Sequence, residues 1–208
     1  AEFVLRAKPD GYTFMSADNA VLAFNEHLFK RLPFSPENDF TYIGAIGKFP
    51  LALVVHPDFP AKDFQQFLAY VKTNPGKVNY ASVGNGSPHH LAMEMFKNQT
   101  STFITHIPYR GAAPAMQDIM GGQIPAMFLD LASGLPIIRG GKVRALAIGS
   151  QQRSAVLPDV PTLKELGVPD VDVFAFQGLL GPKGMAPAIV TQLNQALNKA
   201  LADPTVLK

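Results

Sequence analysis

The chain has 208 residues, 47% of them apolar, enough for one large hydrophobic core or two smaller ones. The net charge is +2 and the basic residues are scattered, so neither nucleic acid nor an anionic membrane is indicated as the main partner. There is no cysteine, which suits an oxidising compartment without proving one, and the longest apolar stretch, 124–138, is too short and too interrupted to span a bilayer.

The first quarter of the sequence predicts one strand, loop and helix. Residues 1–7 resemble the end of a helix, which suggests that something precedes them, and a turn leads from them to a strand predicted at 12–15. The small and polar residues Ser16, Ala17 and Asn19 follow, in a loop that enters an amphipathic helix.

Two strands are predicted next, at 40–46 and 51–55, with residues 47–50 as a joint between them. The second strand is apolar throughout, as fully buried parallel strands are. Asp63 and Gln66 then form a capping box in front of a helix.

The stretch 78–91 is the most informative part of the chain. A short strand runs into a loop of small residues with glycines at 84 and 86, and Ser87 and Pro88 stand at the N-cap and first position of a helix. A helix N-terminus presents backbone N–H groups and a positive dipole end, so this stretch outlines an anion site. The loop contains no Lys or Arg and no phosphate-loop pattern, which favours a small carboxylate over a nucleotide.

Further strands are predicted at 103–109, 126–129 and 143–148, with helices between them. A second capping box is expected at Thr162 and Glu165, extended chain at 171–176, a loop at 178–187 and a last helix at 189–201. Strands that alternate with helices predict an α/β fold with a largely parallel sheet.

Several motifs resemble the Bug-type solute-binding proteins, the periplasmic receptors of tripartite tricarboxylate transporters. The motifs are PDGYT from Pro9, NYASVGNGSPHHLAMEMF from Asn79, HIPYRGAAPAMQDIMGGQI from His106, GKVRALAIGSQQRSAVLPDVPTLKELG from Gly141 and GLLGPKGMAP from Gly178. The resemblance extends over essentially the whole chain.

The resemblance implies a periplasmic-binding-protein-like fold of type II, with two domains joined by crossing strands and the ligand held in the cleft between them. Domain 1 would contain residues 1–50 and 175–208, and domain 2 residues 51–174. Full members have a signal peptide and a first βα unit before this region and continue beyond it, so domain 1 is expected to be incomplete. Members bind small carboxylic acids through backbone amides, small polar side chains and water.

The predicted ligand contacts are Ser16, Ala17, Asn19, Ser82, Gly84, Gly86, Ser87, Tyr109, Gly111, Asp130 and Phe176. Each has a structural alternative. The glycines and Ser87 could serve only to turn the chain and cap the helix, Asn19 and Asp130 could be plain N-caps, and Tyr109 and Phe176 could pack at the rim or in the core.

No cofactor or metal is expected. Adjacent residues on a helix point about 100° apart, so His89 and His90 do not converge on one ion. A serine hydrolase would use Ser87, His90 and Asp130, but the GxSxG pattern is absent.

The sequence therefore predicts a periplasmic receptor that closes over a small mono- or dicarboxylate and delivers it to a membrane permease, and not an enzyme. The alternative is a shortened remnant of such a receptor that folds, or forms oligomers, without a transport function.

Overall fold

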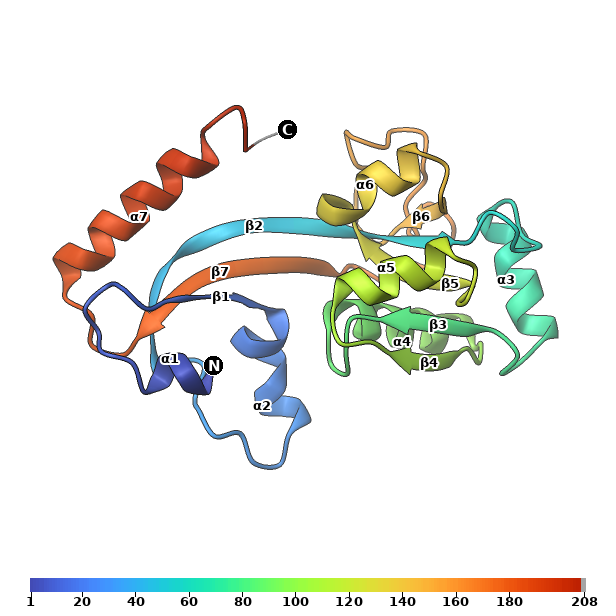
Figure 1. The fold of residues 1–208 in the computed structure, drawn as a ribbon. Helices are drawn as coiled ribbons and strands as arrows, with labels where there is room; N and C mark the ends of the chain where they lie inside the picture. The colour runs from blue at the N-terminus through green and yellow to red at the C-terminus, as the bar shows by residue number, and fades with distance from the viewer. Residues whose placement is uncertain (207–208) are drawn as a thin grey trace. The chain divides into compact units, whose positions relative to one another are not determined.

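The computed structural model describes residues 1–206, and the chain divides into two compact units (Figure 1). Unit 1 contains Ala1–Lys48 and the chain from Phe176 onward, and unit 2 contains Phe49–Ala175. Two long strands, β2 (Phe40–Val55) and β7 (Phe174–Pro182), run from one unit into the other. The fold is α/β, as the sequence predicts.

Unit 2 contains a sheet with helices on both faces. Its other elements are α3 (Phe64–Thr73), β3 (Asn79–Ser82), α4 (Pro88–Thr100), β4 (Thr105–Pro108), α5 (Ala112–Met120), β5 (Ala126–Asp130), α6 (Leu131–Arg139) and β6 (Arg144–Ile148). β3 pairs in parallel with β4 and β5, whereas β5 and β6 pair with β2 in antiparallel. The sheet is therefore mixed. The predicted parallel arrangement holds for β3, β4 and β5 only, because apolar runs identify strands without giving their direction.

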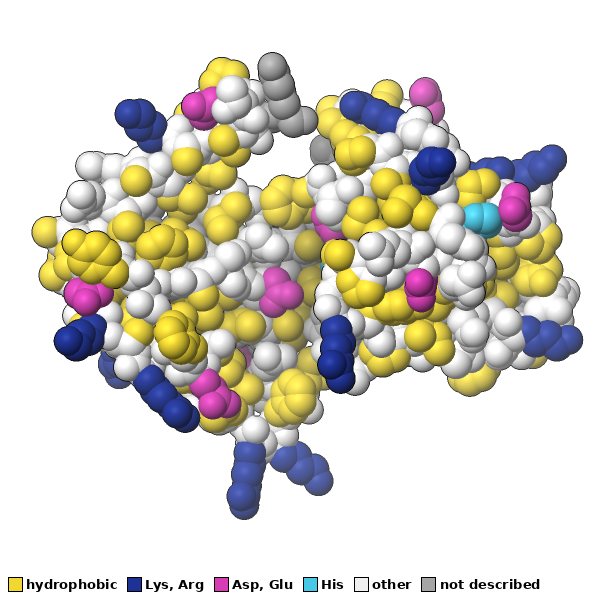
Figure 2. Space-filling view, in the orientation of Figure 1, with side chains coloured by type: hydrophobic (Ala, Val, Ile, Leu, Met, Phe, Trp, Pro, Cys, Tyr) yellow, Lys and Arg dark blue, Asp and Glu magenta, His cyan; other side chains and the backbone are white. Residues whose placement is uncertain are grey.

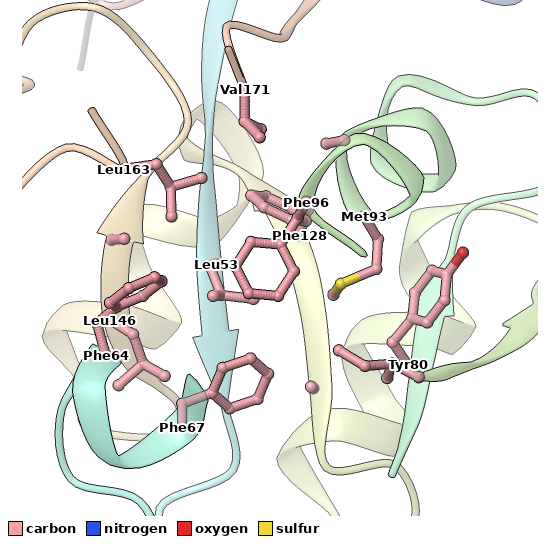
Figure 3. Close-up of a cluster of buried hydrophobic side chains, with 14 of the residues drawn as sticks. Leu53, Phe64, Phe67, Tyr80, Met93, Phe96, Phe128, Leu146, Leu163 and Val171 are labelled. Carbon is pink, nitrogen blue, oxygen red and sulfur yellow. The ribbon is translucent and has the colours of Figure 1, made fainter. Parts of the chain in front are cut away.

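Strict alternation along β2 and β5 builds two cores. Leu51, Leu53 and Phe128 face a cluster with side chains of α3 and α4, whereas Ala52 and Met127 face a second cluster with side chains of α5 and α6. Successive side chains of a strand point to opposite faces, so one apolar strand supplies both layers. Figure 3 shows the first cluster around Leu53 and Phe128.

Both predicted N-caps are present, but only the pair at Thr162 and Glu165 makes both bonds of a capping box. The first pair lacks the second bond because Gln66 Oε1 accepts the N–H of Lys62 instead of that of Asp63. The backbone N–H of Gln66 donates to Asp63 Oδ1 at 2.8 Å, and α3 begins at the next residue after Asp63. The backbone N–H of Glu165 donates to Thr162 Oγ1 at 3.1 Å, and the N–H of Thr162 donates back to Glu165 Oε2 at 2.7 Å. This second box closes a turn rather than a helix.

Unit 1 has a much smaller core. Its other elements are α1 (Glu2–Leu5), β1 (Met15–Asp18), the π-helix η1 (Ala20–Phe24), α2 (Asn25–Leu28) and α7 (Pro187–Leu201). β1 pairs with β7 in antiparallel. The fully buried apolar cluster contains Val4, Ala17, Phe40 and Leu180. The helix α7 docks through Asn194, whose Nδ2 donates to the carbonyl of Ile43 at 2.8 Å.

Three predictions on unit 1 and its borders were wrong. The strand expected at 12–15 lies at Met15–Asp18, the joint expected at 47–50 lies inside the continuous strand β2, and half of the loop expected at 178–187 belongs to β7. The glycines at 47 and 178 suggested loops, but both lie within strands.

Charged side chains are spread over the surface, with basic and acidic groups interspersed on the face that Figure 2 shows. Among residues 1–206, no helix is long and apolar enough to cross a membrane.

Candidate functional site

Unit 2 brings seven of the predicted site residues to one edge of its sheet. The parallel strands β3, β4 and β5 are neighbours, so their carboxyl ends lie together. The loop 82–87 follows β3, Tyr109 and Gly111 follow β4, and Asp130 ends β5. In α/β sheets this edge is where ligands are commonly bound.

The loop after β3 is held by its own two serines. The Ser82 hydroxyl donates to the carbonyl of Gly84 at 3.0 Å and accepts the Gly84 N–H at 3.2 Å. The Ser87 hydroxyl donates to the same carbonyl at 2.8 Å and caps α4 by accepting the N–H of His90 at 3.3 Å. Gly84 and Gly86 have φ angles of +141° and +74°, which L side chains rarely adopt. The structural role that the sequence allowed for these residues is therefore present.

The α4 N-terminus still presents donors. Among residues 1–206, the backbone N–H groups of Asn85 and His89 make no hydrogen bond. His89 is the second helical residue, so its N–H points out of the first turn. Fewer N–H groups are open than the sequence suggested, because those of Gly84 and Gly86 are taken by Ser82 and His90. The remaining donors and the helix dipole still favour an anion.

Tyr109 and Gly111 border the loop. A Cβ on Gly84 would lie 3.7 Å from the Tyr109 carbonyl oxygen. The Tyr109 hydroxyl donates to Asp118 Oδ2 at 2.7 Å, and burial together with this carboxylate raises its pKa to about 12. Gly111 has a φ of +114° and nothing within 4 Å of an added Cβ, so the space in front of it is open.

Asp130 is the N-cap of α6. Its Oδ1 accepts the N–H of Ser133 at 2.9 Å, and its Oδ2 accepts the Ser133 hydroxyl at 2.8 Å. Oδ2 also lies 3.5 Å from Nε2 of His89, a buried ring whose two nitrogens make no hydrogen bond within residues 1–206. Burial alone would raise the Asp130 pKa, but His89 and Ser133 outweigh it and lower the pKa. The carboxylate is thus ionised at neutral pH.

The predicted residues of unit 1 are held within their own fold. Ser16 and Ala17 lie on β1 rather than in a loop, and the Ser16 hydroxyl donates to Gln177 Oε1 at 3.3 Å. Ala17 is buried in the core of the unit. Asn19 does not cap η1 with its side chain. Its Oδ1 instead accepts the backbone N–H of Phe176 at 2.8 Å, so two predicted site residues meet.

Phe176 lines a mostly apolar groove of about 530 Å³ in unit 1. Leu22, Tyr42 and the glycines 44, 47 and 178 line the same groove. The structure thus gives Phe176 a partly exposed position.

The geometry does not favour the two alternative chemistries, a serine hydrolase and a metal site. The Ser87 hydroxyl and the His90 ring bond to Gly84 and Gly86 respectively, not to each other as in a hydrolase triad. Within residues 1–206, no group of three or more His, Cys, Asp or Glu side chains could hold a metal ion.

Sequence reasoning missed a pair of histidines that contacts the loop 82–87. His106 and His90 come from β4 and α4, and their rings stack with a centroid distance of 4.1 Å. His106 Nε2 lies 2.6 Å from Ser82 Oγ, and His90 Nδ1 accepts the Gly86 N–H at 3.1 Å. The alternating pattern of β4 gives a weak signal for His106, but the contact depends on strand pairing.

Comparisons with known proteins find relatives with the same fold. A protein of R. palustris solved with adipate superposes with a TM-score of 0.93 and 29% identity over 98% of this chain and 68% of that one. MatC from Rhodopseudomonas palustris, solved with bound malate, superposes with a TM-score of 0.88. It is 33% identical, over 98% of this chain and 69% of its own. BugT of Bordetella pertussis is 35% identical over 98% of this chain.

The fold is that of a periplasmic binding protein, as the superposed structures show. Residues 1–208 match the family described as "Tripartite tricarboxylate transporter family receptor", and the chain belongs to this family. The family is one of receptors rather than enzymes. The chain spans 61% to 63% of the length of the first curated relatives that it matches.

Proposed function

We propose that this chain is a receptor for a small mono- or dicarboxylate, which it delivers in the periplasm to the permease of a tripartite tricarboxylate transporter. The observation that carries the proposal is the sheet edge of unit 2, where three parallel strands end around the capped N-terminus of α4. Relatives solved with adipate and malate support a carboxylate as the ligand class.

The chemistry of this edge suits a carboxylate. The N–H groups of Asn85 and His89 would donate to one carboxylate oxygen each, directly or through water, and the α4 dipole favours the negative charge. The ionised Asp130 would repel a second carboxylate but would accept a hydrogen bond from a ligand hydroxyl. A hydroxylated acid such as malate is therefore a sensible probe beside an unsubstituted one.

The contribution of unit 1 stays a prediction. Ser16, Ala17, Asn19 and Phe176 are proposed to contact the ligand by their place in the family resemblance. Ala17 could do so only through its backbone, because its side chain is buried. Enclosure of the ligand between two domains likewise stays a prediction.

A titration of the 208-residue protein with adipate, malate and the uncharged dimethyl ester of adipate tests the proposal. Thermal unfolding reports binding, because a ligand of the folded state raises the midpoint as its concentration rises. We expect a saturable rise for at least one acid and none for the ester. Ser87→Ala combined with Gly84→Val should abolish the rise, since Val at a φ of +141° is strained and the cap is lost.

The absence of any rise with either acid, in a protein that unfolds cooperatively, would contradict the proposal. It would favour the alternative of a remnant without a transport function. Ser154→Ala is the matched control, because only the backbone carbonyl of Ser154 makes a hydrogen bond within residues 1–206.

A further inference from the structure

Three stacked rings lie under the loop 82–87. The Tyr80 ring stacks on the His106 ring with centroids 4.9 Å apart and planes at 21°, and His106 stacks on His90 at 4.1 Å and 12°. The rings come from β3, β4 and α4, so the stack joins three elements of unit 2. It touches the loop at two points: His106 Nε2 lies 2.6 Å from Ser82 Oγ, and His90 Nδ1 lies 3.1 Å from the Gly86 nitrogen.

One of these contacts fixes where a ring proton lies. His90 Nδ1 accepts the Gly86 N–H, so the ring must be neutral there and carries its proton on Nε2. His106 Nε2 and Ser82 Oγ form a hydrogen bond in which either group can be the donor, depending on the His106 tautomer. Both ends of the loop 82–87 are thus hydrogen-bonded to a neutral histidine ring.

The charged and titratable groups around the stack are Tyr80, Glu94 and Lys97. Glu94 Oε1 accepts from the Tyr80 hydroxyl and from Lys97 Nζ, both at 2.7 Å, and lies 3.9 Å from His90 Nε2. Burial lowers the pKa of His90, with Glu94 opposing this and Lys97 adding to it. Burial, and after it the neighbouring His90, lower the pKa of His106 to about 4.

We propose that His90 and His106 are positioning residues of the ligand site. As a neutral pair they hold the loop 82–87 in its binding shape, and protonation of His90 Nδ1 releases the loop. The protonated Nδ1–H would face the Gly86 N–H, so that two donors meet. The positive ring would also lie against His106. This inference rests on the proposed function, because it assigns the loop to the ligand.

The test follows the Gly86 amide by NMR in the 208-residue protein from pH 8 to pH 5. In the unchanged protein, the Gly86 proton shift should titrate with the His90 ring, and its protection from hydrogen exchange should fall as the pH falls. His90→Asn offers an amide oxygen near the Nδ1 position and does not titrate, so protection should persist and its pH dependence should vanish. His90→Leu removes the acceptor, so protection should be lost at every pH.

His27→Asn is the matched control, because His27 is 79% exposed and lies in unit 1. It should leave the Gly86 amide unchanged. A Gly86 amide that titrates equally in His90→Asn, or stays protected in His90→Leu, would overturn the positioning role. His90→Asn decides the matter if His90→Leu does not fold.

Calorimetric titration with adipate and malate supplies the second readout. His90→Leu should weaken binding about tenfold, the usual effect of one lost hydrogen bond to a buried donor, whereas His90→Asn should bind like the unchanged protein and without its pH dependence. The two proposals fail separately. If neither acid binds, the proposed function fails. The NMR measurements on the Gly86 amide then still decide whether His90 holds the loop. If an acid binds equally well to His90→Leu, the positioning role fails and the receptor stands.

Discussion

His106 couples the stability of unit 2 to pH. Burial and His90 hold its pKa at about 4 in the folded chain, against roughly 6.5 in an unfolded one. Between these two pH values the His106 ring is protonated in the unfolded chain but neutral in the folded chain. The contribution of His106 to the free energy of unfolding is therefore fully present above roughly pH 6.5 and is lost as the pH falls toward 4.

We expect the free energy of unfolding to fall by about 1 kcal/mol from pH 7 to pH 5, after allowance for the partial exposure of the ring. Urea unfolding at these two pH values measures it, above the range in which carboxylates titrate. His106→Asn should reduce the pH dependence to the part that the lowered pKa of His90 contributes, whereas His27→Asn should retain all of it. An unchanged slope in His106→Asn would show that another group carries the effect.

At the scale of elements, Gly134 permits a close approach between α6 and β5. A Cβ on this residue would lie 2.5 Å from two carbons of Leu129, which is itself fully buried. Real Cβ atoms do not approach that closely, so the helix or the Leu129 side chain must shift. The cap of α6 at Asp130 lies at the start of the same helix, so a shift there reaches the candidate site.

Gly134→Ala should destabilise the protein by roughly 1 to 3 kcal/mol, as overpacked cores usually do. Urea unfolding measures the change, and Gly134→Ala should cost less in a Leu129→Ala background, because that substitution removes both clashing carbons. Ala132→Leu adds bulk to an exposed position of the same helix and should change stability by less than about 0.5 kcal/mol. Equal effects of Gly134→Ala and Ala132→Leu would contradict the close contact.

Local sequence patterns predicted helix caps and buried strands better than they predicted long-range contacts. The caps at Asp63, Thr162 and Ser87 depend on residues three positions apart, so the sequence contains the whole signal. The same holds for Asp130, whose capping role was one of two readings of the sequence. The continuous apolar run at 51–55 likewise predicted a fully buried strand.

Long-range features escaped the sequence. The continuity of β2 was missed because Gly47 and Pro50 usually interrupt strands, yet here the strand passes through them. The Asn19 contact with Phe176 depends on β1 lying beside β7, and the His90 contact with His106 on α4 lying over β4. Such contacts follow from topology, which a single sequence constrains weakly.

At the scale of the whole molecule, the two units differ in how much apolar surface they bury. Unit 2 contains two clusters of fully buried side chains on the two faces of its sheet, whereas the cluster of unit 1 contains four residues. Within residues 1–206, α7 buries none of its residues fully. Since burial of apolar surface is the main favourable term in folding, unit 1 should open more readily.

Hydrogen exchange followed by mass spectrometry should therefore find α7 and β1 exchanging at least about a hundredfold faster than β5, a difference of roughly 3 kcal/mol in opening free energy. Two matched variants assign the effect. Leu53→Ala leaves a cavity in unit 2 and should cost about 2 to 5 kcal/mol there, accelerating β5 while α7 stays as it was. Gly44→Val should do the reverse, because a Cβ on Gly44 would lie 2.9 Å from Asn194 Nδ2 and Leu197 Cδ2 and would shift the side chains through which α7 contacts β2. Equal protection of β5 and α7, or variants that each accelerate both, would show that the two units unfold as one.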